Sequence, residues 1–408
     1  MPARTRNVSR RRRRGSLLSG PSTAILVVAA AGGEAAELPI AEPENVLACS
    51  TTGYLRVPGT DLCLRVGGDV YSDRSVGVGR EVSFTTGYEQ DGSPTAEYRT
   101  LGIRDIFNSM SAYGTIRLRT LTDTDQGTLF TALSLRGTSS DGFELKEAYL
   151  QWAGLTAGFR YSFFDFGTGY NETAGLSSDR DTILYAYTFN VTPNLSVTAS
   201  AEDAVFRRFE DGVWAQYAGQ KIPDLVAAID YEPERGWLHG AIAMHYLDDL
   251  RGGSEEVGWA AILGGMRRFR YGEDSSGRFL ITGAVAKGAL DYLGIPLNAP
   301  DYIREDSGEL RLSTGVSGLV SYEHYWSPKV RSAVTISAYR TKTDTEALQW
   351  NSEGFWVTLG SEYIPVPGLT LGLDVTYYED EVRGEEDDEG EPANAKSVVT
   401  YGFVRRAF

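Results

Sequence analysis

The sequence predicts an all-β protein, a transmembrane antiparallel β-barrel, and three observations support this prediction. Stretches of about ten residues alternate apolar with small or polar side chains, as strands do that face lipid on one side and water on the other. The chain combines 46 Gly and 23 Tyr with only 4 Met, which suits strands joined by many turns. After the N-terminal region, no stretch reaches the roughly 18 apolar residues of a membrane-spanning helix. A bilayer role therefore requires a closed barrel, because only helices and closed sheets satisfy their backbone groups in lipid.

The N-terminal region has the features of a secretory signal peptide. A basic stretch, Arg4–Arg14, precedes an apolar, alanine-rich run at 17–31, and the small residues Gly33 and Ala35 allow cleavage. A basic arm that binds nucleic acid is the alternative, and the adjacent apolar run argues against it. The expected parts of the chain are a signal peptide over 1–35, an N-terminal periplasmic segment over 36–63 and a transmembrane β-barrel over 64–408.

The charge of the chain limits its partners. A formal net charge of −16 argues against nucleic acid, because phosphate contacts need a basic surface. The acidic tract 379–391 is interpreted as a solvated extracellular loop. A site that binds divalent cations or bridges lipopolysaccharide is the alternative, although the tract lacks the ordered ligand spacing of a calcium loop. We expect no metal site and no cofactor.

Two cysteines, Cys49 and Cys63, flank a short segment that contains Gly53, Pro58 and Gly59. In an oxidising periplasm they can form a disulfide, and the glycines and proline let the intervening loop turn tightly. Free thiols are the alternative. Two cysteines without a nearby histidine are a poor metal site.

Pro and Gly mark short turns that recur along the chain, and these turns set the expected strand count. They fall at 191–194, 231–236, 274–277, 326–329 and 366–368. The spacing fits a hairpin with one short and one long end. About 43 residues per hairpin over 64–408 gives about eight hairpins, or about 16 strands.

Single strands show the alternation directly. In 369–377, one face carries Leu371, Leu373 and Val375, and the other carries Asp374 and small polar residues. A soluble β-sandwich is the alternative, because its strands alternate too. Aromatic residues near the short turns favour a membrane barrel, in which they form an interfacial girdle. These residues are Phe189, Tyr231, Trp237, Trp326 and Tyr363.

Two segments resemble the porins of alphaproteobacteria. The first is the lead Ala41-Glu-Pro-Glu44 followed by Cys49 and by Val57-Pro-Gly-Thr-Asp-Leu-Cys-Leu-Arg-Val-Gly67, which is similar to the mature start of that family. The second is the ending Phe403-Val-Arg-Arg-Ala-Phe408. Between them the likeness is one of pattern, and the stretch 75–110 departs from it by being long and irregular. The resemblance implies a 16-stranded barrel, a homotrimer in the bacterial outer membrane, contact with its lipid and lipopolysaccharide, and passive diffusion of small hydrophilic solutes.

The resemblance also implies a pore constriction. In such porins the long third loop folds into the lumen, and the matching stretch here is 162–181. Its glycines allow bends, and carboxylates on it could face arginines on the wall, which would set selectivity for charged solutes. The expected carboxylates are Asp165, Glu172, Asp179 and Asp181.

The wall arginines follow from strand parity. Residues such as Ile116, Leu118 and Phe159 are expected to face lipid, so their neighbours face the lumen. An arginine facing lipid at mid-depth would cost about 2–4 kcal/mol, which supports the lumen assignment. The candidates are Arg117, Arg119, Arg136 and Arg160, with Arg331 and Lys146 as weaker ones. Together with the loop carboxylates they suggest a weak cation preference.

Two rival functions remain open at this point. One is a barrel hydrolase, for which His245 before Asp248 and Asp249 is the candidate cluster. No Gly-x-Ser-x-Gly, His-Glu-x-x-His or P-loop pattern supports it, so we expect a protein that is not an enzyme and has no catalytic residues. The other rival is an adhesive or structural surface protein that uses the acidic loops. Ion conductance separates a channel from both.

Overall fold

The computed structural model describes residues 49–408 except 50, 52, 89–93, 141, 209–216, 220, 253, 296–299, 306, 345–348 and 384–392. Within 80–107, 344–350 and 382–394 it describes only the backbone of the strands. The expected signal peptide and most of the expected periplasmic segment lie outside the described residues. So does most of the acidic tract 379–391.

The described residues form strands and two short 3₁₀ helices, in the order β1 (Leu55–Arg56), β2 (Cys63–Tyr88), β3 (Pro94–Thr124), β4 (Gly127–Thr138), β5 (Gly142–Trp152), β6 (Leu155–Tyr161), β7 (Asp181–Thr192), β8 (Leu195–Glu202), η1 (Ala204–Arg207), β9 (Asp224–Tyr231), β10 (Gly236–Asp248), β11 (Glu255–Arg270), β12 (Ser276–Lys287), η2 (Leu290–Leu293), β13 (Tyr302–Arg304), β14 (Leu310–Leu312), β15 (Thr314–Ser327), β16 (Val330–Asp344), β17 (Gln349–Val366), β18 (Leu369–Arg383) and β19 (Ala393–Ala407). In the part of the chain that the structure describes, no helix is long and apolar enough to span a membrane.

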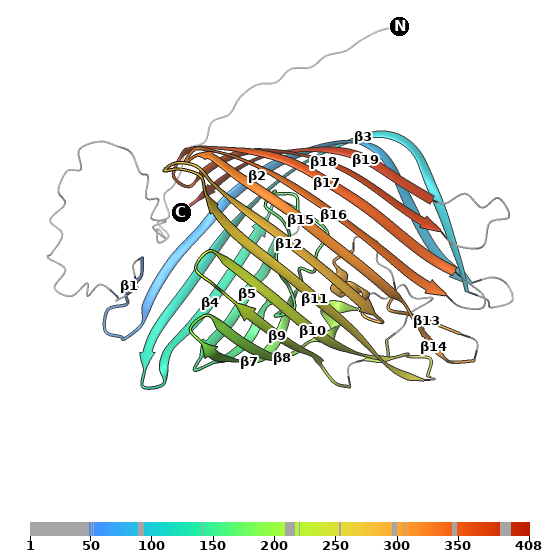
Figure 1. Ribbon diagram of the computed structural model, residues 1–408, viewed down its shortest axis with the longest axis horizontal. Helices are drawn as coiled ribbons and strands as arrows, with labels where there is room; N and C mark the ends of the chain where they lie inside the picture. The colour runs from blue at the N-terminus through green and yellow to red at the C-terminus, as the bar shows by residue number, and fades with distance from the viewer. Residues whose placement is uncertain are drawn as a thin grey trace, which may run out of the picture. The chain divides into compact units, whose positions relative to one another are not determined.

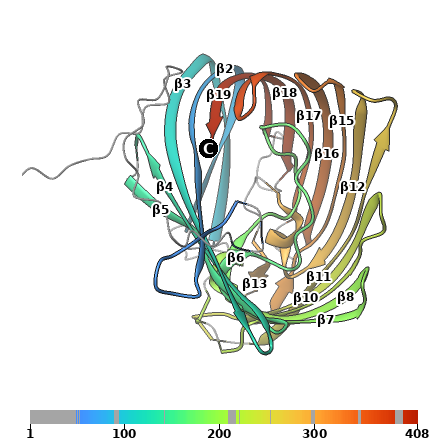
Figure 2. The ribbon, with the colours of Figure 1, turned by 90° about the vertical axis from the view of Figure 1, so that its left-hand side faces the viewer.

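The long strands close into a 16-stranded antiparallel barrel, as the sequence predicts (Figure 1). Each strand from β2 to β12 and from β15 to β19 pairs with its neighbour in sequence, with β15 following β12. The ring closes where β19 pairs with β2, from Lys396 opposite Arg80 to Ala407 opposite Asp69. Figure 2 shows this closure, with blue β2 beside red β19. A closed ring leaves no sheet edge unpaired, which is the condition for spanning lipid.

The barrel wall alternates with period two. In β18, Leu371, Leu373 and Val375 are 39%, 51% and 38% exposed on the outer face, whereas Asp374 and Thr376 are only 2% and 3% exposed on the inner face. The expectation from 369–377 is confirmed. Polar side chains point inward and apolar ones outward, which is the arrangement of a barrel with lipid outside.

The short turns lie where the sequence predicts them, for example between β7 and β8 and between β17 and β18. Four of the five aromatic residues near them are exposed, and these are Phe189, Tyr231, Trp326 and Tyr363. The expectation for Trp237 is wrong. Its neighbour Leu238 is 55% exposed on the outer face, so Trp237 points inward, where its ring packs edge-on against Phe166 at 5.0 Å between centroids.

Strand lengths differ more than the expected ten residues. The backbone of β2 and β3 forms one long hairpin of 26 and 31 residues, paired from Cys63 opposite Leu121 to Tyr88 opposite Pro94. The described part of 75–110 is therefore regular strand with one bulge, and the interpretation as an irregular stretch is wrong. In contrast, β6 has only 7 residues. The barrel wall is therefore short at β6, the strand after which the chain turns inward.

The disulfide is confirmed. Cys49 and Cys63 are bonded, with their Cα atoms 6.0 Å apart. Cys63 is the first residue of β2, so the bond ties the segment before the barrel to the start of its first long strand.

Candidate functional site

The segment 162–180, which we call the inward segment, leaves β6 after Tyr161 and rejoins the wall at β7. Figure 2 shows it inside the ring of strands. Backbone N–H groups of Tyr170 and Leu176 donate to the hydroxyls of Ser321 on β15 and Ser337 on β16, each at 3.0 Å. The N–H of Thr173 donates to a carboxylate on β18 at 2.9 Å. These partners lie far around the barrel from β6, so the predicted inward fold is confirmed.

The inward segment rests on an apolar seat. Phe164, Phe166 and Leu176 are 0%, 4% and 3% exposed, and they pack in one cluster with the inner faces of β9 to β12. The wall makes room for them with small residues, namely Ala228, Ala241, Ala243, Ala260, Ala284 and Ala286. At Gly264 an added Cβ would lie 2.2 Å from the ring of Phe166. Burying each phenylalanine side chain contributes about 1.5–3 kcal/mol to holding the segment in place.

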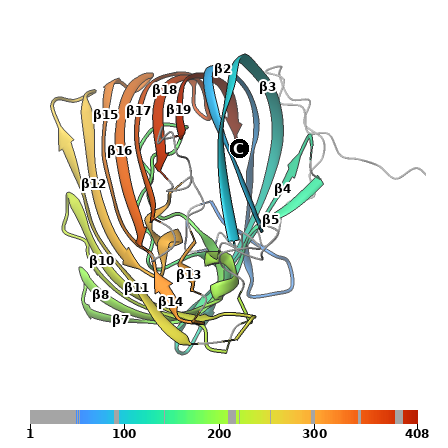
Figure 3. The same cartoon turned by 90° about the vertical axis from the view of Figure 1, so that its right-hand side faces the viewer.

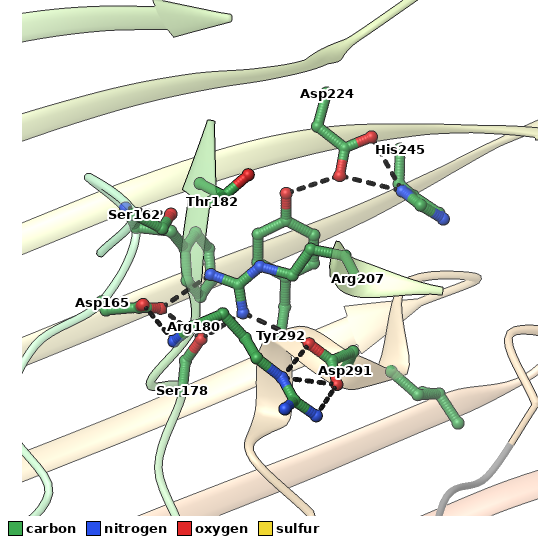
Figure 4. Close-up of polar contacts among 12 residues, drawn as sticks. Ser162, Asp165, Ser178, Arg180, Thr182, Arg207, Asp224, His245, Asp291 and Tyr292 are labelled. Atoms are coloured by element: carbon green, nitrogen blue, oxygen red, sulfur yellow. Dashed lines mark hydrogen bonds and ion pairs between the residues drawn. The ribbon is translucent and has the colours of Figure 1, made fainter. Parts of the chain in front are cut away.

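A buried arginine clamps the base of this segment. Arg207 lies in η1, between β8 and β9, and its side chain is 1% exposed. Its guanidinium donates to Asp165 and Ser178, both at 2.8 Å, and stacks over the ring of Tyr292 at 4.1 Å (Figure 4). Burial lowers the pKa of Arg207, but attraction to Asp165 and its other anionic neighbours outweighs it, so the net pKa is raised. Arg207 is therefore held charged inside the protein.

Asp291 joins a third segment to the same clamp. It lies in η2, between β12 and β15. Figure 3 shows these two strands as neighbours in the barrel wall. Arg180 donates to it from Nε and Nη2, at 3.0 Å and 2.6 Å, and Nη1 of Arg207 lies 3.5 Å away. The inward segment, the connection after β8 and the connection after β12 are thus held together by two arginines and two carboxylates, because Asp165 completes the set.

The polar network continues to His245, and it corrects the cluster expected there. His245 Nδ1 lies 2.8 Å from Asp224, and Nε2 lies 3.6 Å from Asp301. Tyr292 donates to Asp224 at 2.7 Å. Asp248 and Asp249 were the expected partners of the histidine; instead, Asp249 accepts a hydrogen bond from Tyr302 at 3.0 Å. His245 is fully buried between two carboxylates, so it serves as an internal contact between the wall and the connection 288–313.

The predicted wall arginines lie on three strands, Arg117 and Arg119 on β3, Arg136 on β4 and Arg160 on β6. Ile116, Leu133 and Leu135 are exposed outside, which puts the alternate positions on the lumen face. Arg117 pairs with Asp69 on β2 at 2.5 Å, and Arg119 lies opposite Arg65 on that strand.

Two further wall arginines stack on aromatic rings. Arg136 lies 4.3 Å above Tyr113, and Arg160 lies 4.7 Å from both Tyr161 and Phe163. Within the described residues, Arg119, Arg136 and Arg160 form no ion pair, whereas Arg117 does. Three positive charges on this wall are therefore not neutralised by a described carboxylate.

The predicted loop carboxylates separate into different environments. Asp165 is buried in the clamp, and Glu172 accepts from Arg405 on β19 at 3.2 Å. Asp179 is exposed and forms no hydrogen bond or ion pair with the described residues. Burial raises the pKa of Glu172, against the pull of Arg405. Partial desolvation by the surrounding segment, together with nearby Asp165, raises the pKa of Asp179. Asp181 opens β7, opposite Tyr161.

The two weaker candidates are accounted for by local geometry. Arg331 is 12% exposed and bridges Glu323 at 2.6 Å and Glu362 on the neighbouring strands β15 and β17. Lys146 lies in β5 near a bulge between Ser134 and Leu135 in the register with β4, which is why parity fails to place it.

Sequence reasoning missed Arg207 and Asp291 altogether. Their partners are 42 and 111 positions away in sequence, and neither lies in a patterned strand. The one local signal was the run of inward-facing alanines, which indicates that something packs against that wall.

Comparison with known proteins places the chain among outer-membrane barrels. A family model described as a porin subfamily matches residues 37–402. Porin Omp2b of Brucella suis is 30% identical over 250 residues, which cover 52% of this chain and 61% of that protein. Outer membrane protein y4fJ of Sinorhizobium fredii is 32% identical over 171 residues, 38% of this chain and 46% of that protein. The matches thus span less than two thirds of these curated relatives.

Solved structures share the fold at low sequence identity. The outer membrane channel DcaP of Acinetobacter baumannii superposes with a TM-score of 0.65 at 15% identity, covering 85% of this chain and 97% of that one. An anion-selective porin from Comamonas acidovorans superposes with a TM-score of 0.52 at 11% identity, covering 85% and 100%. Because the family model covers nearly all of the barrel, this chain belongs to the porin subfamily, and its place is the bacterial outer membrane.

Proposed function

We propose that this chain forms a channel for passive diffusion of small hydrophilic solutes and ions. The proposal rests on the inward segment, which is fixed against the inner faces of β9 to β12, and on the inward-facing arginines of β3, β4 and β6. A polar lumen narrowed by a fixed segment would admit small hydrated solutes, and charges at the narrow point would sort them.

The distribution of unpaired charge argues for anions at this constriction, in contrast to the cation preference suggested by the residue types. Two of the expected carboxylates, Asp165 and Glu172, are committed to arginines. Arg119, Arg136 and Arg160 have no such partner within the described residues. We therefore propose these three arginines, with Asp179 of the inward segment, as the charges that a permeating ion meets.

The homotrimer implied by the sequence resemblance is part of this proposal, as is contact with outer-membrane lipid and lipopolysaccharide. Apolar side chains such as Leu263 and Ile242, 72% and 62% exposed, suit a surface covered by lipid or by a second copy. The molar mass of the detergent-purified protein, measured by light scattering, would test the trimer: a monomer would contradict it.

We propose no enzymatic activity for this barrel. The hydrolase alternative depended on His245, whose ring nitrogens approach two carboxylates in a fully buried network. Among the described residues, no group of three His, Cys, Asp or Glu side chains converges to hold a metal ion.

Single-channel recording in a planar bilayer tests the proposed function. Stepwise insertions with a reversal potential that favours anions are the expected result. A folded, heat-modifiable barrel that does not conduct would contradict a channel and favour an adhesive or structural role.

A further inference from the structure

A cavity of about 320 Å³ lies between the inward segment and the inner face of β10 to β12. Its lining includes Tyr161, Phe166, Tyr170, Asp179, Trp237 and Arg278. Trp237 and Arg278 lie near the short-turn ends of β10 and β12, so the cavity is on the periplasmic side of the inward segment. Tyr161 is 47% exposed and Asp179 is also exposed, so the cavity opens to the lumen.

The aromatic wall of this cavity is fixed without a ligand. The indole N–H of Trp237 donates to Asp230 at 2.8 Å, and the ring packs edge-on against Phe166. Phe166 in turn stacks on His239, with 5.1 Å between centroids and 4° between planes. A rigid aromatic surface loses little entropy when a solute packs on it, which favours binding.

The polar groups of the cavity are of mixed character. Asp179 is a hydrogen-bond acceptor without a described partner. Arg278 donates from Nε to Glu323, and a guanidinium has four further N–H donors for a ligand. The hydroxyl of Tyr170 is buried and has no partner among the described residues, and the Arg278 guanidinium lies 4.8 Å above its ring. The cavity lining thus includes both a carboxylate acceptor, Asp179, and a guanidinium donor, Arg278.

We propose that this cavity is a binding site for a neutral, cyclic, polyhydroxylated solute, of the size of one or two sugar rings, on its way through the pore. This inference rests on the proposed channel function. A sugar ring has an apolar C–H face that fits an aromatic wall and a rim of hydroxyls that both donate and accept. An organic cation would use only Asp179 and an anion only Arg278, whereas a neutral polyol satisfies both. The volume is at the small end for ligand cavities, which limits the solute to that size.

Current recordings with sugars test the site. Maltose added to the intact protein in a planar bilayer should interrupt the single-channel current reversibly and saturably. Sorbitol at equal concentration, an acyclic polyol without a flat face, should lower the current only through viscosity. Equal effects of the two solutes, or stronger interruption by the trication spermidine than by maltose, would overturn the proposal.

Two tryptophans provide a matched pair of variants. Trp237→Ala removes the inner ring and should raise the half-blocking maltose concentration about tenfold, the loss of a single aromatic packing contact. Trp326→Ala removes a ring that is 63% exposed outside, also near a short turn, and should leave the block unchanged. Asp179→Asn, at an exposed position, should weaken the block even if Trp237→Ala fails to fold. Equal block in Trp237→Ala and Trp326→Ala, or in Asp179→Asn and the unaltered protein, would overturn the site.

A second measurement separates this site from the channel itself. Quenching of tryptophan fluorescence by maltose can be measured with the full-length protein in detergent, without conductance. Binding without conductance would contradict the proposed channel and support the site. Conductance without maltose-specific block or binding would contradict the site and leave the channel.

Discussion

Two halves of the same barrel wall use their inward positions differently. On β9 to β12, inward residues include a group of alanines, such as Ala241 and Ala260, and the inward segment packs on them. On β3 to β6, inward residues include Arg119, Arg136 and Arg160, and no described segment neutralises them. The two halves share one strand alternation. A lumen-facing position is therefore either a packing site for a folded-in segment or a surface for solute, and a group of alanines marks the packing site.

The largest expected effect comes from removing Arg207, which holds the base of the inward segment in place. Arg207→Ala leaves Asp165 and Asp291 without their buried cation, and breaking such a pair costs about 3–5 kcal/mol. The inward segment should detach from its base, which would raise single-channel conductance and current noise. Heat-modifiability on gels would verify that the barrel still folds.

Arg180→Ala provides the comparison for this clamp. Its side chain is 47% exposed and, among the described residues, forms its ion pair with Asp291 alone, so the same measurement should give a smaller rise in conductance. Arg207→Lys should raise the conductance less than Arg207→Ala does, because lysine retains the positive charge. Equal conductance in all three variants would show that the clamp does not position the segment.

The next effect disturbs the seat itself. Gly264→Val places side-chain atoms where the ring of Phe166 lies and should cost about 1–3 kcal/mol by overpacking. Phe166 would be displaced, and conductance should rise less than in Arg207→Ala. Gly265→Val is the matched control, since a Cβ there faces the flexible end of Leu238 on the outer face. A rise in the control as large as in Gly264→Val would contradict the role of the seat.

The role of the arginines on β3 to β6 is tested by changing their charge. Replacing Arg119 and Arg160 with Gln should shift the reversal potential toward cations, because their positive charge has no described partner. Arg117→Gln should shift it less, because Arg117 already pairs with Asp69. The difference should be largest in about 0.01 M salt, where the screening length is about 30 Å. Equal shifts would mean that pairing does not decide which arginines act on ions.

The smallest expected effect is a pH dependence of selectivity. Burial of Glu172 and partial desolvation of Asp179 raise their pKa values above the ordinary 4.5 and 3.8, so both take up protons at higher pH than ordinary carboxyls. Lowering the pH from neutrality should therefore remove negative charge from the inward segment before ordinary carboxyls are protonated, and should increase anion preference. Asp179→Asn should reduce this change, measured as the reversal potential against pH. A shift of the reversal potential toward cation preference at low pH would contradict this predicted direction.

Alternation and turn chemistry predicted the barrel because both are local. A strand such as 369–377 carries its own inner and outer faces, and a turn such as 366–368 carries its own Pro and Gly. The parity of Arg117 and Arg160 could be read in the same way. The clamp could not, because Arg207 meets Asp165 and Asp291 only after three connections have folded together. Trp237 shows the limit of such local reasoning. Its position near a turn predicts an outward side chain, whereas the strand alternation with outward Leu238 places it inward.

In the proposed channel, the inward segment narrows a lumen whose wall carries the arginines of β3, β4 and β6. The most direct test is the single-channel conductance of a variant that lacks residues 167–175, the part of the segment that reaches across to β15, β16 and β18. If the segment narrows the lumen, this variant should have a larger conductance and a reversal potential closer to zero than the intact protein, with the barrel still heat-modifiable. A folded variant whose conductance and reversal potential equal those of the intact protein would contradict it.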